Sequence, residues 1–126
     1  MQVAIYGRKI TKLTLPAFSE ILKTISVYGW GILLEEDLYK SLEQKGGVDY
    51  PCTTFSSYAD LKQDVDLMIS VGGDGTFLKS VDYVRDSEVP VLGINTGRLG
   101  FLANVAKDQI QEALNLVKEK KYIFQK

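Results

Sequence analysis

The sequence predicts a three-layer α/β domain, with a mostly parallel sheet and helices on both of its faces. Short apolar runs of strand length alternate along the chain with longer segments in which apolar residues recur at helical spacing. The strand-like runs are almost continuously apolar, as is typical of strands covered on both faces. A length of 126 residues, 45% of them hydrophobic and 25% charged, suits a single domain over residues 1–126 with a core of its own.

In the first half of the chain, proline and glycine residues separate the runs. Pro16 suits the first turn of a helix, where its missing N–H costs nothing, and Gly29 stops the helical spacing that follows. The glycine pair at 46–47 ends a second, shorter helix. The expected elements are, in order, a strand at 3–6, a helix carrying Phe18, Ile21, Leu22 and Ile25, a strand at 32–34, a helix carrying Leu38 and Leu42, an edge strand around 52–55 and a helical turn near 58–61.

The second half begins with the strongest strand signal, at residues 66–71, which runs directly into Gly-Gly-Asp-Gly-Thr at 72–76. Pro90 stands near the start of the next apolar run, where a missing donor is tolerated. The charged run at 118–121 is expected to be a solvated helix end, because lysines suit the negative end of a helix dipole. The expected elements are, in order, a strand at 66–71, a helix carrying Phe77, Leu78, Val81 and Val84, a strand at 89–94, a loop at 95–102 and a helix carrying Ile110, Ala113, Leu114 and Val117.

The composition excludes several functional classes. Cys52 is the single cysteine, so no intrachain disulfide forms, which fits a reducing cytoplasm. The lack of histidine removes Ser-His-Asp and Cys-His catalysis and every histidine-ligated metal site. A net charge of −1 argues against a nucleic-acid or anionic membrane surface, and no apolar run approaches the roughly 20 residues of a membrane helix. We therefore expect a cytoplasmic domain without nucleic-acid or membrane partners.

The segment at 72–76 has the composition of a phosphate cradle. Three glycines in four positions permit unusual backbone angles and remove the Cβ atoms that would hold a ligand away. The helix that follows aims free N–H groups and a positive dipole end at this segment. Asp74 repels phosphate, so its presence indicates a base facing a hydroxyl or a ligand of Mg²⁺, and hence phosphoryl transfer to an alcohol. The alternative is a tight turn in which Asp74 or Thr76 caps the helix.

Other candidate residues have two interpretations each. Lys79 lies about one helical turn beyond the glycines, where it reaches a phosphate or pairs with Asp82. Phe101 and Leu102 offer an apolar platform to an aromatic ring or pack in the core. The carboxylates at 35–37 bind a ribose or stand at the start of a helix. Neither the Rossmann dinucleotide fingerprint nor the P-loop pattern occurs in the chain.

At two segments the sequence resembles the NAD kinases. The Gly-Gly-Asp-Gly-Thr motif at 72–76 is shared with diacylglycerol and sphingosine kinases and, in related form, with phosphofructokinases. The segment at 93–102, Gly-Ile-Asn-Thr-Gly-Arg-Leu-Gly-Phe-Leu, is much more particular to NAD kinases. The resemblance covers the whole chain and implies a Rossmann-like, phosphofructokinase-like N-terminal domain. It also implies transfer of the γ-phosphate of ATP to the 2′-hydroxyl of the adenosine ribose of NAD, giving NADP, with Mg²⁺ or another divalent metal.

The resemblance carries roles onto matching positions of this chain. Asp74 matches the proton acceptor of the family. Lys79 matches a position where some members place a basic residue on the nucleotide, and Phe101 and Leu102 match residues that line the adenine side of the pocket. The cofactor-binding residues expected from the resemblance are Gly73, Asp74, Gly75, Thr76, Lys79, Phe101 and Leu102.

The chain departs from the family in length. Family members continue into a β-rich domain that supplies an Asn-Glu pair, another glycine- and serine-rich loop and much of the oligomer interface, and none of it is found here. The resemblance therefore implies the N-terminal domain of a longer, homo-oligomeric enzyme, and we expect the isolated chain to fold but to be inactive or nearly so. The alternatives are a lipid-kinase-like phosphotransferase domain and a stand-alone adenine-nucleotide-binding module.

Overall fold

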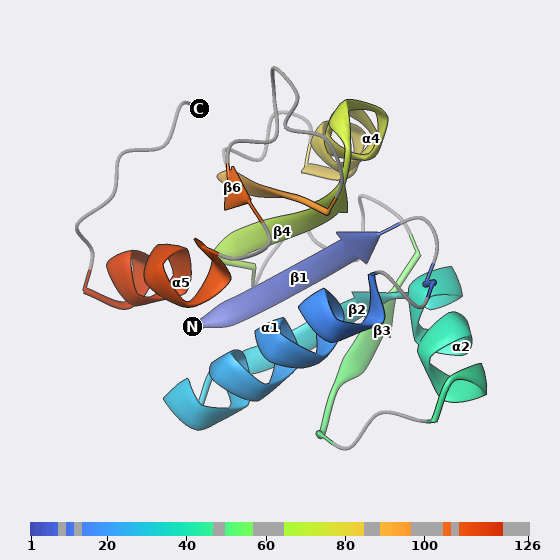
Figure 1. Cartoon of the computed structure of the whole chain (residues 1–126), viewed down its shortest axis with the longest axis horizontal. Helices are drawn as coiled ribbons and strands as arrows, with labels where there is room; N and C mark the ends of the chain where they lie inside the picture. The colour runs from blue at the N-terminus through green and yellow to red at the C-terminus, as the bar shows by residue number, and fades with distance from the viewer. Residues whose placement is uncertain are drawn as a thin grey trace.

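The computed structural model confirms the α/β class and describes residues 1–7, 10–11, 14–46, 50–56, 65–84, 89–96, 105–106 and 109–119. Six strands form one sheet in the order β3-β2-β1-β4-β5-β6, and every neighbouring pair is parallel (Figure 1). The described elements are, in chain order, β1 (Gln2–Gly7), α1 (Leu15–Tyr28), β2 (Gly31–Glu35), α2 (Glu36–Gln44), β3 (Thr53–Phe55), β4 (Leu67–Gly72), α4 (Asp74–Val84), β5 (Val91–Asn95), β6 (Val105–Ala106) and α5 (Ile110–Lys118).

The strand order places a topological switch between β1 and β4. From β1 the sheet extends outward through β2 to β3, and the chain then returns to the other side of β1 and continues outward through β4, β5 and β6. In register, Ala4 of β1 pairs with Leu33 on one side and with Met68 on the other. Ligands of open parallel sheets bind beyond the carboxyl ends of the strands at such a switch. The carboxyl ends of β1 and β4 are therefore the expected place for a ligand.

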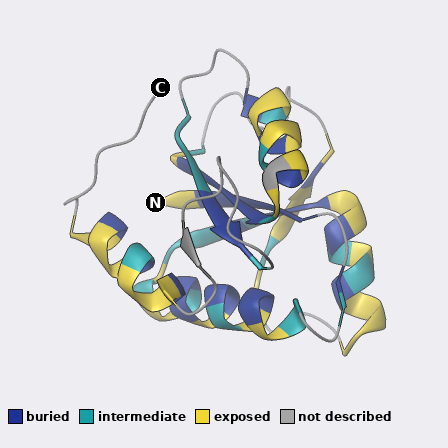
Figure 2. Cartoon of the chain, turned by 45° about the horizontal axis from the view of Figure 1, so that its top comes forward, coloured by how far each residue is buried: buried dark blue, intermediate teal, exposed yellow. Residues whose placement is uncertain are grey.

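Helices cover both faces of the sheet, which gives the expected three layers (Figure 1). Successive side chains of a strand point to opposite faces. Val3 and Ile5 lie in the larger core cluster, together with buried residues of α1, α2 and α5. Ala4 and Tyr6 lie in the smaller cluster with Val84 of α4. Figure 2 shows the strands buried between helices whose outer faces are exposed, so burial on both faces explains the nearly continuous apolar strands.

The helix α1 begins and ends where proline and glycine in the sequence predicted. Pro16 lies in its first turn, where no intrahelical N–H bond is lost. Gly29 follows its last residue with a φ of 77°, a left-handed conformation that glycine adopts at low cost. The N–H of Gly29 donates to the carbonyl of Ser26 over 3.0 Å, which satisfies one of the carbonyls at the helix end.

The helix α4 is confirmed, but of its four expected apolar residues only Val84 is fully buried. Leu78 and Val81 are 58% and 39% exposed. The side toward the sheet is formed instead by Thr76, Ser80 and Val84, which are all buried and follow one another at intervals of four residues. Two of these three side chains are small and polar, so α4 packs against the sheet with little side-chain volume between them.

The structure confirms two further strands that the sequence predicted and adds a short one. The edge strand expected around 52–55 is β3, and the strand expected at 89–94 is β5, which begins two residues later and ends one residue later. The two-residue strand β6 was not predicted from the sequence, and it pairs with β5. The helical turn expected near 58–61 lies outside the described residues. Among the described helices, none has the length and apolar character needed to cross a membrane.

Candidate functional site

The candidate site lies where β1, β4 and β5 end side by side. The last residue of β4, Gly72, pairs in register with the last residue of β5, Asn95. The N–H of Thr96 donates to the carbonyl of Gly72 over 3.3 Å, so the chain leaving β5 stays beside the end of β4. The segments at 72–76, which we call the glycine turn, and at 95–102 therefore begin at the same edge of the sheet, as the sequence predicted.

Gly72 opens the glycine turn in a conformation that residues with side chains rarely adopt, with a φ of 152°. It also leaves no room for a side chain. A Cβ at this position would lie 2.6 Å from Oγ1 and 2.9 Å from Cβ of Thr76, which is itself only 7% exposed. Glycine therefore lets β4 turn sharply into α4 while the Thr76 side chain packs beneath the turn.

The start of α4 is open to a ligand. The helix begins at Asp74, and the N–H of Phe77 donates to the carbonyl of Gly73 over 3.0 Å in its first turn. The N–H groups that precede this bond, including that of Gly75, have no partner within the helix, and the helix dipole makes this end positive. A Cβ added to Gly73 would meet no atom within 4 Å. An anion such as a phosphate group can therefore approach the backbone closely here.

The structure brings several of the predicted residues together at this point. Gly73, Asp74 and Gly75 all lie at the junction of β4 and α4. The side chain of Asp74 lies outside the described residues. Thr76 belongs to the same turn, but its side chain is buried against Gly72. Lys79 is exposed on the surface of α4, about one turn further along the helix.

The second predicted segment is described only at its start. Asn95 is 2% exposed at the end of β5, and Thr96 is half-buried. Phe101 and Leu102, which were expected to line the adenine side, lie outside the described residues. In the part of the chain that the structure describes, no group of three or more aspartate, glutamate or cysteine side chains is placed to hold a metal ion. The described residues thus assign no protein ligand to the divalent cation that the resemblance implies.

The acidic residues after β2 form the start of a helix. The carboxylate of Glu35, 6% exposed, accepts the N–H of Asp37 at 3.0 Å and that of Leu38 at 3.1 Å, one with each oxygen. Glu36 pairs on the surface with Lys40 at 3.4 Å. Of the two interpretations drawn from the sequence, the helix-start role is therefore confirmed for Glu35, which caps α2.

Tyr83 connects α4 to aromatic side chains of β1 and β3. Its ring centroid lies 5.3 Å from that of Tyr6 and 5.4 Å from that of Phe55. Burial raises the pKa of Tyr83, and the negative charge of Glu35 raises it further. The two ring contacts indicate that Tyr83 holds α4 against β1 and β3 by packing.

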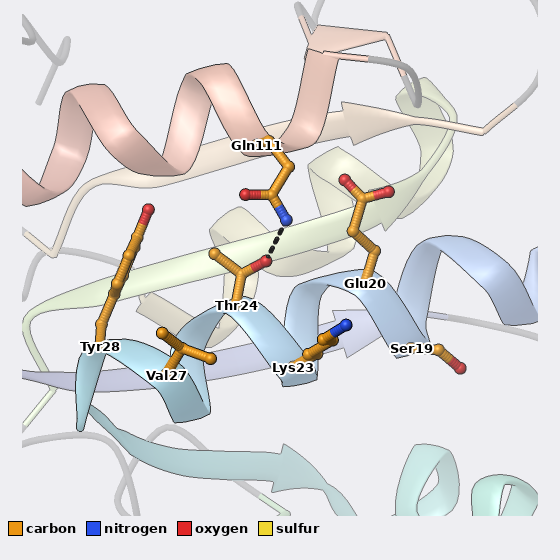
Figure 3. Close-up of a pocket in the computed structure, with 7 residues that line it drawn as sticks. All are labelled: Ser19, Glu20, Lys23, Thr24, Val27, Tyr28 and Gln111. Carbon is orange, nitrogen blue, oxygen red and sulfur yellow. Dashed lines mark hydrogen bonds between the residues drawn. The ribbon is translucent and has the colours of Figure 1, made fainter.

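A groove of about 520 Å³ lies between α1 and α5, apart from the glycine turn. Figure 3 shows its single drawn hydrogen bond, from Nε2 of Gln111 to Oγ1 of Thr24, at 2.6 Å. The Lys118 ammonium lies 4.7 Å from the ring centroid of Tyr28, which also joins the two helices. Because α1 ends at Tyr28, just before β2 starts, the end of the groove at Tyr28 is near the edge of the sheet where the strands begin. The lining residues are Ser19, Glu20, Lys23, Thr24, Val27, Tyr28 and Gln111.

One residue beside the site was not singled out from the sequence. Ser80 is fully buried between α4 and the sheet, and its hydroxyl donates to the carbonyl of Thr76 over 3.0 Å. The signal that points to it is the four-residue spacing of Thr76, Ser80 and Val84, which places all three on one face of the helix. The spacing of apolar residues alone does not point to this face, because two of its three side chains are polar.

Comparison with known protein families shows to which family this fold and glycine turn belong. The family model of the ATP-NAD kinase N-terminal domain matches residues 3–122. The chain belongs to the NAD kinase family. The match includes both segments on which the resemblance was based, 72–76 and 93–102.

Individual NAD kinases give the same result and show how much of each protein the chain represents. It is 38% identical over 126 residues to the NAD kinase of Flavobacterium psychrophilum, covering 100% of this chain and 43% of that protein. It is 36% identical over 122 residues to the NAD kinase of Christiangramia forsetii, covering 97% and 42%. The chain thus spans about two-fifths of the length of these curated relatives. Yeast NADH kinase complexed with NADH matches with a TM-score of 0.79 over 96% of this chain and 38% of that chain, and at 23% identity this likeness shows the fold.

Proposed function

We propose that this chain is the nucleotide-binding N-terminal part of an enzyme that phosphorylates the 2′-hydroxyl of the adenosine ribose of NAD with ATP and yields NADP. The observation that carries the proposal is the glycine turn at the topological switch of the sheet, in a chain that matches the NAD kinase family model over residues 3–122. The open backbone at Gly73 and the positive end of α4 suit a phosphorylated nucleotide.

In the proposed reaction, Asp74 takes the proton of the ribose 2′-hydroxyl. The ribose oxygen then forms a bond to the γ-phosphorus of ATP while the bond from that phosphorus to the β-γ bridging oxygen breaks, and ADP leaves. The position of Asp74 as the first residue of α4 supports this role, because it stands beside the backbone N–H groups that would bind phosphate. A general base in such a position typically contributes about 10²–10⁴ to the rate.

The other predicted residues take binding roles in this proposal. The backbones of Gly73 and Gly75 approach the nucleotide, Thr76 holds the turn, and the ammonium of Lys79 meets a phosphate. Phe101 and Leu102 line the adenine side of the pocket. A divalent cation such as Mg²⁺, bound with ATP, neutralises charge on the phosphates.

We expect catalysis to require a part of the enzyme that lies outside residues 1–126. The curated relatives are more than twice as long as the segment they share with this chain. In the proposal, residues 1–126 form one domain, and a second domain completes the pocket and contributes to a homo-oligomer in the cytoplasm. The isolated chain then folds and makes NADP slowly or not at all.

The test is NADP formation from NAD, ATP and Mg²⁺, measured with a coupled NADP-specific dehydrogenase. It is run on this chain and on the product of the complete reading frame that contains it, each with Asp74→Asn as the matched control. We expect activity from the complete product, reduced about 10²–10⁴-fold by Asp74→Asn. Activity of the isolated chain would overturn the requirement for a second domain. If the complete product forms no NADP, the proposed kinase activity is wrong. Retained NAD binding in that case would indicate a nucleotide-binding module.

A further inference from the structure

Ser80 occupies the centre of the contact between α4 and the sheet. It is 0% exposed, and its hydroxyl donates to the carbonyl of Thr76, one turn earlier in the helix, over 3.0 Å. The hydroxyl of a serine inside a helix can donate to the carbonyl four residues earlier, which also accepts the backbone hydrogen bond of the helix. Such bonding often bends the helix. The bond therefore bears on the direction in which the first turn of α4 leaves the sheet.

The residue that accepts this bond is in turn packed against the glycine turn. The side chain of Thr76 lies directly beneath Gly72, so close that a Cβ on Gly72 would meet its Oγ1 at 2.6 Å. The carbonyl of Gly72 accepts the N–H of Thr96 from the chain after β5. Ser80, Thr76 and Gly72 thus form a continuous series of contacts from the middle of α4 to the point where both glycine-bearing segments begin.

We propose that Ser80 is a positioning residue for the site at the glycine turn, acting through Thr76. Its hydroxyl holds the turn of α4 that begins at Thr76, and Thr76 holds Gly72. The N–H groups at the start of α4 then keep the direction that a bound phosphate needs. This inference rests on the proposed nucleotide-binding function. Displacements near 1 Å reduce the efficiency of such sites substantially, so a single buried hydroxyl is sufficient to matter.

The experiment uses the product of the complete reading frame that contains this chain, with three substitutions. Ser80→Ala removes the hydroxyl with little loss of volume, and Ser80→Thr keeps a hydroxyl that can bond the same carbonyl. Thr24→Val is the matched control, because Thr24 is also buried, at 4% exposure, and loses its bond with Gln111 in the α1–α5 contact on the opposite face of the sheet. The unfolding midpoint of each variant is measured first, so that the other measurements are made on folded protein.

Two measurements are then compared. The first is the hydrogen-exchange rate of the Phe77 amide, which bonds the Gly73 carbonyl in the first turn of α4. The second is the Kd for NAD, obtained by titration. We expect Ser80→Ala to speed this exchange and to raise the Kd about 3–10-fold, in line with the loss of one hydrogen bond. We expect Ser80→Thr to restore both quantities to within about twofold of the parent, and Thr24→Val to leave both unchanged.

The outcomes separate this inference from the proposed function. If Ser80→Ala leaves exchange at Phe77 unchanged, or changes it no more than Thr24→Val does, Ser80 is an ordinary packing residue and the inference is overturned. Failure of Ser80→Thr to restore the exchange rate overturns it as well. If the parent protein does not bind NAD but the exchange rates follow the expected order, Ser80 still holds the first turn of α4, and it is the proposed nucleotide-binding function that fails. If exchange follows the expected order but Ser80→Ala leaves the Kd for NAD unchanged, the role of Ser80 is structural and the inference is overturned.

Discussion

Replacing Gly72 by alanine tests whether the glycine turn has the geometry described here. The substitution adds one methyl group at a position with a φ of 152°, where the backbone strain of a residue with a side chain is about 1–3 kcal/mol. The added Cβ would also lie 2.6 Å, 2.9 Å and 3.1 Å from the three side-chain atoms of Thr76, and overpacking of this kind costs about 1–3 kcal/mol. We therefore expect Gly72→Ala to lower the free energy of unfolding by about 2–6 kcal/mol.

Two other glycines separate the two contributions. Gly46 has a φ of 129° and open space around an added Cβ, so Gly46→Ala carries the backbone strain alone. Gly73 has open space without a left-handed φ, so we expect Gly73→Ala to change stability by less than about 0.5 kcal/mol. The expected order of destabilisation is Gly72→Ala, then Gly46→Ala, then Gly73→Ala.

The assay is urea unfolding at equilibrium, followed by the fluorescence of the single tryptophan, Trp30, and by far-ultraviolet circular dichroism. Agreement of the two signals checks that each variant unfolds in one step. A destabilisation by Gly72→Ala equal to that by Gly46→Ala would show that Thr76 does not pack beneath the turn, and one equal to that by Gly73→Ala would exclude the backbone strain as well. The account of the junction between β4 and α4 would then be wrong.

Three further predictions follow from described contacts. Glu35→Ala removes the cap of α2 and should lower the free energy of unfolding in urea by about 1–2 kcal/mol. Glu36→Ala, at the exposed surface, should lower it by about 0.5 kcal/mol or less, and equal losses for the two variants would contradict the cap. Burial raises the pKa of Tyr83, so its contribution to stability is present below the ordinary tyrosine pKa and is lost as pH rises through the raised value. Tyr83→Phe should thus lose less stability than the parent under alkaline conditions, and an equal loss would argue against the raised pKa. Burial, with a smaller effect of Glu43, also raises the pKa of Cys52, so iodoacetamide should alkylate it more slowly than a free thiol in the same mildly alkaline buffer. An equal rate of alkylation would contradict the raised pKa.

The elements of this fold were predictable where local signals were strong. Pro16 and Gly29 mark the two ends of α1 because their backbone preferences act within a single turn. The apolar run that leads into the glycine turn predicts β4 and the start of α4 for the same reason. The glycine turn itself was predicted from its composition to be a ligand site, because three closely spaced glycines let a ligand approach the backbone.

Other features depend on contacts between distant parts of the chain. The strand β6 has only two residues, too few for any periodicity, and it is a strand because it pairs with β5. The buried face of α4 was predicted only at Val84, because the sheet also packs against Thr76 and Ser80 while Leu78 and Val81 remain exposed. A helical residue is buried by what lies opposite to it, and that partner is not encoded in the spacing along the helix.

The local sequence was therefore sufficient for the fold class, for most of the helices and strands, and for the family, since each of these depends on residues that are neighbours in the chain. The strand order, the meeting of the glycine turn with the end of β5, and the packing of Thr76 beneath Gly72 arise from pairing between segments far apart in sequence. The physical reason is that hydrogen bonding and packing across a parallel sheet select a partner only once the chain has folded, whereas turn and helix preferences act on each segment before it does.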